Sequence, residues 1–534
     1  MIRIKKILLS IVLTALVLPM LQNSLHIFRI RPLEGDFVME DKPAYSKTGW
    51  YDGEFQARYN NWLEQNIGFR DLLVRINNQI DFSLFKKPHA EGVEVGRNKI
   101  LYEYDYIRAY MGDDFIGEPT LDRKMRRLKY MQEYLLKNKN IRLILVLEPS
   151  KARYEPEYLP GKYDTSARQI SNYELIVQKA GEYNITFLDL NQYFLKMKDS
   201  SRYLLYPQYG VHWSEYGMSL AVDTLIGFIE DTCKLDLPDI YVDEIIVSDS
   251  LRSTDYDAGK PLNLLWNLRN VPMAYPQMRY ENNPDKDRPN VLAVADSYYW
   301  NIFNVYLPHN LFNNEAFWYF NSLVYPEFYY GPLYTEDLDL QAEVEKQDII
   351  LIMVTERFQF KYDWRFVDNI YELYTPEFEP DHQYNYENDI RMNLTLFDEL
   401  ARDAMESEMT LEEVIRREAD FLFITENLQK YLETYGPRYY YDVIRKDTAW
   451  FRTIKEKANK QEISVDAQLI KDANYMFKKE YPEIFEKYYA IQSIKDAIKN
   501  DPEWMHTIQQ KAAEKYLTPE EMIHQDAVWL YNNQ

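Results

Sequence analysis

Between residues 121 and 354, short apolar runs alternate with stretches of helical periodicity, and this alternation limits the possible folds more than any other feature. The apolar runs, each bounded by polar or turn-forming residues, lie at 141–147, 185–190, 291–294 and 348–354. The helical stretches lie at 121–138, 166–183 and 214–231. Parallel strands that are covered on both faces have continuous apolar sequences and require long crossover connections, usually helices. The pattern therefore predicts an α/β unit, a parallel sheet with helices on both faces.

Polar residues stand where several of these segments end. Ser297 follows the third apolar run, and Lys151 and Glu356 follow the first and the fourth, while His212 precedes the third helical stretch. In an open α/β sheet, ligands bind at the carboxyl ends of the strands. A serine at that edge becomes a nucleophile if a base takes its proton, and His212 is the best candidate base among seven histidines. The alternative is that Ser297 only caps the next helix and that His212 is a hydrogen-bonded structural residue.

The N-terminus carries a membrane-directed segment. Basic residues precede an apolar run at 7–21, which continues loosely to residue 28. Such a flank favours a cytoplasmic N-terminus, and no small-residue cleavage site follows the run. We therefore expect residues 1–28 to form an uncleaved single-pass transmembrane anchor and residues 29–53 a linker, with the bulk of the chain in the periplasm or elsewhere outside the cytoplasm. A cleaved signal peptide is the alternative, because a run of about 20 residues is barely long enough to span a bilayer.

Charge and cysteine content narrow the range of partners. The chain has 62 Lys and Arg against 85 Asp and Glu, which gives a net charge of −23. This excess of acid argues against nucleic-acid binding and against broad electrostatic attachment to anionic lipid. Cys233 is the only cysteine, so no disulfide can form within the chain.

The last third of the chain contains an internal repeat, because similar residues recur at an offset of 54 positions. The matching sets include Ile390/Ile444/Ile498, Ala419/Ala473/Ala527 and Phe421/Tyr475/Trp529, and hydroxyl N-caps recur at Thr410/Ser464/Thr518. We expect residues 54–389 to form the α/β domain and residues 390–534 an all-helical domain of three 54-residue repeats. Each repeat is expected to be a helix pair whose repeated Ala and aromatic positions face inward. Such arrays usually bind partners or brace a neighbouring domain.

Several segments between residues 54 and 360 occur in an order typical of a known family. They are Gly68-Phe-Arg70, Val95-Gly-Arg-Asn-Lys-Ile-Leu-Tyr102, Leu147-Glu-Pro-Ser-Lys151, Val211-His-Trp-Ser-Glu-Tyr-Gly217, Ala295-Asp-Ser297 and Val354-Thr-Glu-Arg357. Together they resemble the periplasmic alginate O-acetyltransferases, an SGNH-hydrolase-like family of the DHHW type with an Asp-x-His-Trp signature. The resemblance implies an SGNH-hydrolase-like sheet in which the histidine precedes the serine.

The resemblance also implies an activity and its partners. The expected activity is that of an O-acetyltransferase or acetyl esterase that acts on an exported or cell-surface polysaccharide through an acyl-serine intermediate. The polysaccharide is the substrate, a membrane-bound O-acyltransferase is a candidate acetyl donor, and neither a cofactor nor a metal is expected.

The residues that would carry this chemistry follow from the motifs. Ser297 is the expected nucleophile and His212 the expected base, and backbone N–H groups after Ser297 are the expected oxyanion donors. Residues expected to bind or position the substrate are Lys151, Trp213, Tyr298, Glu356 and Arg357. For the charged members of this set, a salt bridge at a strand end is the alternative role.

Gly210 departs from the family pattern, because it stands where the signature has aspartate. That acid fixes the tautomer of the histidine and stabilises the imidazolium, which glycine cannot do. Three explanations are open: an acid from elsewhere substitutes, a backbone carbonyl orients His212 in a dyad, or the domain has lost its chemistry. In the last case the protein would be a non-catalytic glycan-binding or assembly protein of a polysaccharide export system.

Overall fold

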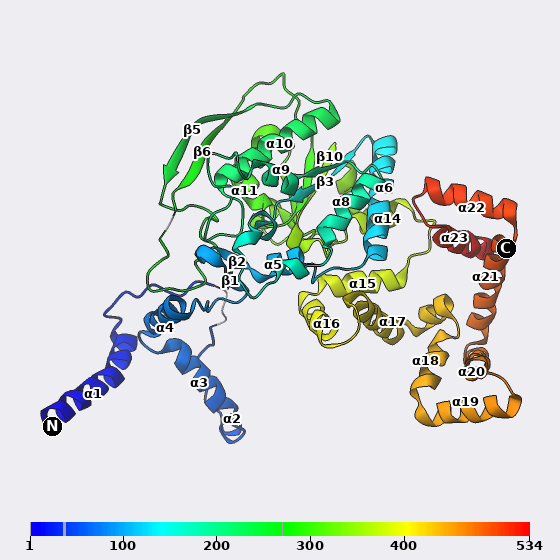
Figure 1. Cartoon of the computed structure of the whole chain (residues 1–534), viewed down its shortest axis with the longest axis horizontal. Coiled ribbons are helices and arrows are strands. Elements are labelled where there is room, and N and C mark those ends of the chain that lie inside the picture. The colour runs from blue at the N-terminus through cyan, green and yellow to red at the C-terminus, as the bar shows by residue number, and fades with distance from the viewer. Residues whose placement is uncertain (1, 36–38, 270, 534) are drawn as a thin grey trace.

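The computed structural model describes residues 2–35, 39–269 and 271–533. Figure 1 shows the α/β unit between a group of N-terminal helices and an all-helical region that contains the C-terminus. The three parts expected from the sequence, an apolar N-terminal helix, an α/β unit and an all-helical C-terminal region, are therefore confirmed. The boundaries placed between them after residues 28, 53 and 389 stay predictions.

The sheet of the α/β unit has six strands. Their order is β4 (Phe187–Asp189), β3 (Arg142–Glu148), β10 (Ile349–Thr355), β7 (Val291–Ala295), β8 (Ala316–Tyr319) and β9 (Leu323–Tyr325). The first five strands are parallel, whereas β9 pairs antiparallel with β8. The four predicted strands are β3, β4, β7 and β10, so the parallel core is confirmed although the whole sheet is mixed. The edge strand β9 differs because a very short turn joins it to β8, and parallel pairing requires a long crossover.

Successive side chains of each strand point to opposite faces of the sheet, and helices cover both faces. Ile144 and Val146 pack on the face covered by α5 (Tyr104–Met111), α9 (Leu190–Met197), α10 (Glu215–Cys233) and α11 (Tyr299–Asn304). Leu145 and Leu147 pack on the face covered by α6 (Glu118–Lys139), α8 (Asn172–Glu182) and α14 (Phe366–Tyr374). This burial on both sides is the reason for the continuous apolar strand sequences. Short helices α7 (Lys151–Tyr154), α12 (Leu307–Leu311) and α13 (Leu340–Glu345) complete the connections.

A separate antiparallel hairpin is formed by β5 (Ile240–Ser248) and β6 (Met273–Tyr280). Charged residues inside β5 and a proline inside β6 interrupt any apolar run, and no strand was predicted here. The connection between these strands, residues 249–272, returns to the α/β unit, where the Gly259 N–H donates to the Tyr209 carbonyl at 3.0 Å.

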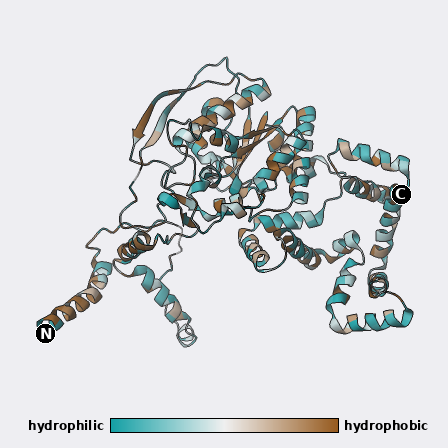
Figure 2. Cartoon of the chain, in the orientation of Figure 1, coloured by the Kyte–Doolittle hydropathy of each residue, from teal (hydrophilic) through white to brown (hydrophobic). Residues whose placement is uncertain are grey.

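The N-terminal part consists of α1 (Ile2–Leu25), α2 (Lys47–Tyr51), α3 (Glu54–Asn66), α4 (Arg70–Phe85) and the hairpin β1 (Val93–Val95) and β2 (Leu101–Glu103). Among the described residues, Arg3–Leu25 is the one stretch long and apolar enough to cross a membrane, judged by length and composition. None of its apolar window is buried against the rest of the protein. Figure 2 shows the hydrophobic character of this helix along its length.

The helical region repeats in groups of three helices. The groups are α15 (His382–Met392), α16 (Leu394–Glu406) and α17 (Leu411–Tyr435); α18 (Arg438–Lys446), α19 (Thr448–Gln461) and α20 (Val465–Glu480); and α21 (Pro482–Asn500), α22 (Pro502–Glu514) and α23 (Pro519–Asn532). The hydroxyls of Thr410, Ser464 and Thr518 cap the third helix of each group, as their spacing predicts. Each repeat is therefore a helix triplet rather than the expected pair, since a further helix ends at the start of each predicted pair.

The repeated positions divide between the interior and the surface. Ala419, Ala473 and Ala527 are buried, as predicted. In contrast, the aromatic residues Phe421, Tyr475 and Trp529 are 60%, 66% and 55% exposed, so the prediction that they face inward is wrong. The reason is helix geometry: two residues along an α-helix correspond to a rotation of about 200°, so a buried Ala places the aromatic residue on the opposite side.

Candidate active site

Ser297 lies just beyond the carboxyl end of β7, and its neighbour Asp296 fixes its position. Asp296 Oδ2 accepts hydrogen bonds from the N–H and the hydroxyl of Thr355, at 2.8 and 2.7 Å. Its Oδ1 accepts a bond from the N–H of Tyr298 at 3.0 Å. Because Thr355 ends β10, these bonds join the ends of two adjacent strands directly below the serine. Asp296 therefore positions Ser297 and is not a partner of His212.

His212 lies in the loop before α10, within reach of Ser297. Its Nε2 is 2.9 Å from Ser297 Oγ, the separation of a hydrogen bond between a base and a nucleophile. The imidazole packs against the ring of Tyr298, with 4.8 Å between the ring centroids, and its side chain is 15% exposed. The structure thus brings together the two residues that the sequence analysis paired.

Asp257 supplies the acid that is missing from position 210. Its Oδ2 lies 2.5 Å from His212 Nδ1. Its Oδ1 accepts hydrogen bonds from the N–H groups of Val211 and Ala258, at 2.9 and 2.7 Å. Serine, histidine and aspartate are thus arranged in line, with the carboxylate on the outer nitrogen of the imidazole, as in a Ser-His-Asp triad. Of the three explanations for Gly210, this geometry favours an acid from elsewhere in the chain.

Gly210 creates the space through which that acid reaches the histidine. A Cβ atom at position 210 would lie 2.3 Å from the carbonyl oxygen of Thr254 and 2.8 Å from Cγ of Pro207. The backbone of the 249–272 connection can therefore pass directly beside Gly210 and carry Asp257 to the imidazole. Sequence reasoning did not identify Asp257, because it lies outside every recognised motif, on a connection whose path the sequence does not reveal.

Lys151 holds the loop that precedes His212. Its Nζ donates hydrogen bonds to the carbonyl oxygens of Pro207 and Gly210, both at 2.6 Å, and of Gln208 at 3.2 Å. The side chain is 1% exposed, and burial lowers the pKa of Lys151 to about 8. The lysine that was predicted to position substrate is thus placed where it positions the loop that carries His212.

The other predicted substrate residues are also engaged by the protein. Tyr298 is fully buried and its hydroxyl donates to the Val211 carbonyl at 2.7 Å, while Trp213 packs against Tyr298 with ring centroids 5.1 Å apart. Glu356 accepts hydrogen bonds from Arg153 at 3.1 Å, and Arg357 pairs with Glu103 and Asp105. Direct contact of these four residues with substrate stays a prediction.

The backbone N–H groups that follow Ser297 already have acceptors. The N–H of Tyr298 donates to the Asp296 side chain, and that of Tyr299 donates to the Asp296 carbonyl at 3.3 Å. Neither group is free in this arrangement to stabilise an oxyanion. Burial, together with the neighbouring charge of Asp296, raises the pKa of the Glu148 carboxyl well above its ordinary value.

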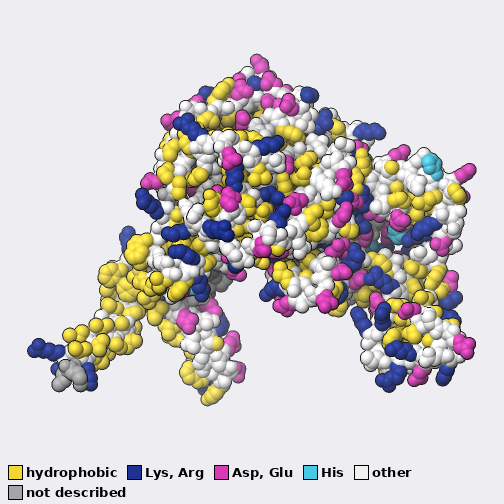
Figure 3. Space-filling model, viewed as in Figure 1, with side chains coloured by type: hydrophobic (Ala, Val, Ile, Leu, Met, Phe, Trp, Pro, Cys, Tyr) yellow, Lys and Arg dark blue, Asp and Glu magenta, His cyan; other side chains and the backbone are white. Residues whose placement is uncertain are grey.

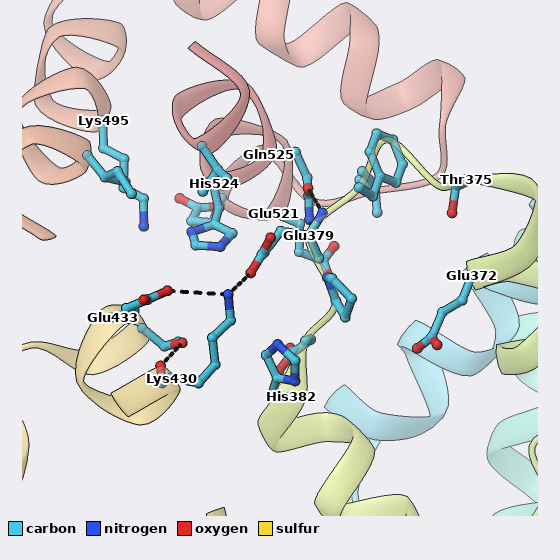
Figure 4. A pocket seen from close by; sticks show the side chains of 18 of the residues that line it. Glu372, Thr375, Glu379, His382, Lys430, Glu433, Lys495, Glu521, His524 and Gln525 are labelled. Atoms are coloured by element: carbon cyan, nitrogen blue, oxygen red, sulfur yellow. Dashed lines mark hydrogen bonds and ion pairs between the residues drawn. The ribbon is translucent and has the colours of Figure 1, made fainter. Parts of the chain in front are cut away.

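A cavity of about 680 Å³ lies away from the triad, between α6, α17, α21 and α23. Figure 4 shows Lys430 pointing into it between Glu379 and Glu433, with Lys495 and His524 nearby. The third repeat closes this space by returning to the α/β unit, where Arg126 donates to Glu521 at 2.9 Å.

Across residues 2–35, 39–269 and 271–533, no group of three or more His, Cys, Asp or Glu side chains is placed to hold a metal ion.

A serine, a histidine and a carboxylate in line at the carboxyl edge of an α/β sheet have the geometry that is typical of acyl-transfer sites. Residues 94–243 match the family model described as an SGNH hydrolase-like domain, acetyltransferase AlgX. The resemblance inferred from the sequence is thereby confirmed, because residues 94–243 carry a segment of the SGNH-hydrolase-like acetyltransferase type, in line with the enzyme class expected. The matched segment includes His212 and ends before Asp257 and Ser297.

Solved structures with similarity to the chain include two from pseudomonads. The O-acetyltransferase domain of Pseudomonas putida AlgJ has 16% sequence identity, covering 53% of this chain and 99% of that chain, with a TM-score of 0.35. Pseudomonas aeruginosa AlgX has 14% identity, covering 52% and 67%, with a TM-score of 0.34. Bacillus cereus PatB1 has 11% identity, covering 46% and 91%, with a TM-score of 0.26. The comparison with curated proteins found no match.

Proposed function

We propose that this protein is an O-acetyltransferase that modifies an exported or cell-surface polysaccharide through an acyl-serine intermediate. The observation that carries the proposal is the line of three side chains, with 2.9 Å from Ser297 to His212 and 2.5 Å from His212 to Asp257. Support comes from the match of residues 94–243 to a family of acetyltransferases.

The geometry suggests how the reaction would proceed. Ser297 Oγ attacks the carbonyl carbon of an acetyl donor while His212 Nε2 takes the hydroxyl proton, and Asp257 stabilises the imidazolium. When the bond between the acetyl group and the donor breaks, His212 gives that proton to the leaving group. A sugar hydroxyl then attacks the acetyl-serine, its proton passes to His212, and collapse of the intermediate releases the acetylated sugar. His212 finally returns the proton to Ser297 Oγ. Attack by water in place of the sugar would make the protein an esterase.

The position of the enzyme in the cell is a second part of the proposal. We place α1 across the membrane as a single-pass anchor and the rest of the chain in the periplasm or outside the cytoplasm. A membrane-bound O-acyltransferase is the proposed acetyl donor, since an anchored enzyme would lie beside it. Sequencing of the N-terminus of the mature protein tests the anchor, because a start after residue 22 would identify a cleaved signal peptide instead.

Trapping of the acyl-enzyme tests the chemistry. The purified chain is incubated with an activated acetyl ester, quenched in acid and analysed by peptide mass spectrometry. We expect one acetyl group on the peptide that contains Ser297, and release of the acetyl group to an oligosaccharide faster than to water. Ser297→Ala should abolish labelling, whereas Ser200→Ala, at an exposed serine, should label like the unaltered protein. Labelling that persists in Ser297→Ala, or acetate as the sole product, would contradict the proposed transferase.

A further inference from the structure

Helix α4 turns its polar side chains toward the protein. Arg75, Asn78 and Phe82 form its buried face, with exposures of 3%, 6% and 2%. Arg75 donates to the carbonyl oxygens of Leu264 and Pro32 at 3.2 and 2.5 Å, and Asn78 donates to that of Leu262 at 3.0 Å. The helix is therefore attached to the 249–272 connection by hydrogen bonds from two buried polar side chains, and Phe82 adds an apolar contact with the core.

The opposite face of α4 is an outward-facing apolar stripe. It consists of Leu73, Ile76, Ile80 and Leu84, which are 53%, 36%, 50% and 69% exposed. Their spacing of three, four and four residues places them in one row along the helix. A surface helix of a water-soluble protein has the reverse arrangement, with apolar residues inside and polar residues outside. Exposed apolar surface of this kind marks a site of contact with a membrane, a protein or a ligand.

The stripe is continuous with the membrane-directed helix. Gly68, just before α4, lies so close to α1 that a Cβ atom there would sit 2.0 Å from the Pro19 carbonyl oxygen. The rings of Phe28 and Phe69 are in tilted contact with centroids 5.8 Å apart, which joins the segment just after α1 to the residue just before α4. In Figure 2 the ribbon of α1 has the colour of hydrophobic residues over most of its length, and Figure 3 shows hydrophobic side chains covering this helix and continuing onto the surface beside it.

We propose that α4 is a second membrane contact, lying in the interface between lipid headgroups and acyl chains with its apolar stripe directed into the bilayer. Trp266 belongs to the same contact, because its backbone N–H donates to the side-chain oxygen of Gln79 in α4 at 3.1 Å and its side chain is 70% exposed. Tryptophan is enriched at this depth of a membrane. The contact rests on the proposed insertion of α1, which brings the start of α4 to the bilayer surface.

Lipid is favoured over a partner protein as the occupant because the stripe adjoins a helix whose own apolar surface is unburied. The net charge of −23 means that attraction to anionic headgroups does not hold the chain in place, so apolar insertion must supply the binding energy. The consequence for the enzyme is orientation: a single transmembrane helix leaves the α/β unit free to tilt, whereas a second contact fixes the height and angle of the triad above the membrane.

Depth-dependent fluorescence quenching tests this contact in the full-length chain. In a Cys233→Ser background, a single cysteine is placed at Ile80, at Leu13 in α1, or at the exposed Gln461 of α19, and is labelled with an environment-sensitive fluorophore. The protein is reconstituted into vesicles of phosphatidylcholine that carry quenchers at shallow or deep acyl positions. We expect the label at Ile80 to be quenched mainly by shallow groups, the label at Leu13 by deep groups, and the label at Gln461 by neither.

The possible outcomes distinguish the proposed α4 contact from the proposed insertion of α1 into the membrane. Quenching at Leu13 without quenching at Ile80 would overturn the α4 contact and leave the anchor intact, and a protein partner would then be the candidate occupant of the stripe. Absence of quenching at both sites would overturn both. A Leu73→Gln/Leu84→Gln variant labelled at Ile80 should lose most of its quenching while the same variant labelled at Leu13 keeps it. Unchanged quenching at Ile80 in that variant would also contradict a role for the stripe.

Discussion

The carboxylate of Asp257 lies 2.5 Å from His212 Nδ1, although 45 positions separate the two residues in the sequence. Both oxygens of this carboxylate have partners. Oδ2 contacts the imidazole, and Oδ1 accepts hydrogen bonds from the backbone N–H groups of Val211 and Ala258. The aspartate is thus held by the same loop that it orients. Ser297, His212 and Asp257 therefore have the arrangement of a Ser-His-Asp triad, although the Asp-x-His sequence pattern is absent.

Replacement of Asp257 by Asn should remove most of the activity while leaving the fold intact. The amide keeps the shape of the side chain but cannot stabilise the imidazolium or hold the correct tautomer, so kcat is expected to fall by about 10⁴-fold. Asp243→Asn, which breaks the exposed pair with Arg279 on the β5–β6 hairpin, is the matched control and should leave kcat unchanged. Acetyl transfer to an oligosaccharide measures both, and near-normal turnover by Asp257→Asn would exclude it from the triad.

Gly210→Ala should impair the enzyme because the new Cβ would collide with the Thr254 carbonyl, 2.3 Å away. The 254–257 backbone must then move, and we expect a loss of about 1–3 kcal/mol in stability together with a large fall in kcat. Gly210→Asp should fail in the same way rather than restore the family pattern. Gly227→Ala in α10, where a Cβ meets nothing within 4 Å, is the control and should be neutral or stabilising by up to about 1 kcal/mol. Equal thermal stability of Gly210→Ala and the unaltered protein would contradict this account.

The sequence was sufficient for the parts of the site that lie on regular elements. Ser297 follows a strand that is apolar because it is buried on both faces, and His212 precedes a helix with a clear N-cap at Ser214. Both therefore had a predictable place at the edge of the sheet. Asp257 did not, because it lies on an irregular connection whose path depends on tertiary contacts such as that of Gly259 with Tyr209.

The exposed aromatic residues of the repeat show a second limit of prediction from the sequence. A repeated residue type indicates a repeated environment, yet periodicity alone does not say which side of a helix faces the core. Ala419 is buried and Phe421 is 60% exposed on the same helix, two positions apart. The orientation of α4 could not be predicted from the sequence either. Arg75 and Asn78 face inward because they donate hydrogen bonds to the 249–272 connection, and these contacts depend on the tertiary structure.

Lys151→Met should act on turnover through the catalytic loop. Methionine fills a similar volume but donates no hydrogen bond, so the carbonyls of Pro207, Gln208 and Gly210 lose their shared donor. We expect a stability loss of about 1–3 kcal/mol and a fall in kcat that exceeds any rise in KM, because the base moves while the substrate surface does not. Lys162→Met removes an exposed pair with Glu94 and should change neither. A rise in KM alone would instead indicate that Lys151 contacts substrate.

Stability should fall in mild acid because of His524, which lines the cavity between the helical region and α6. Burial lowers the pKa of His524 to about 4, Lys495 and Lys430 lower it further, and Glu379 and Asp381 act in the opposite direction. The unfolded chain takes up a proton near the ordinary histidine pKa of about 6.5, whereas the folded chain does so near 4. The free energy of unfolding should therefore decrease as pH falls between these values, by up to about 3 kcal/mol from this residue.

Chemical denaturation at a series of pH values measures the dependence of this free energy on pH. His524→Gln should flatten it in this window, and His506→Gln, at an exposed histidine of α22, should not. If His524→Gln leaves the slope unchanged, the histidine is not held neutral by its surroundings in the folded protein.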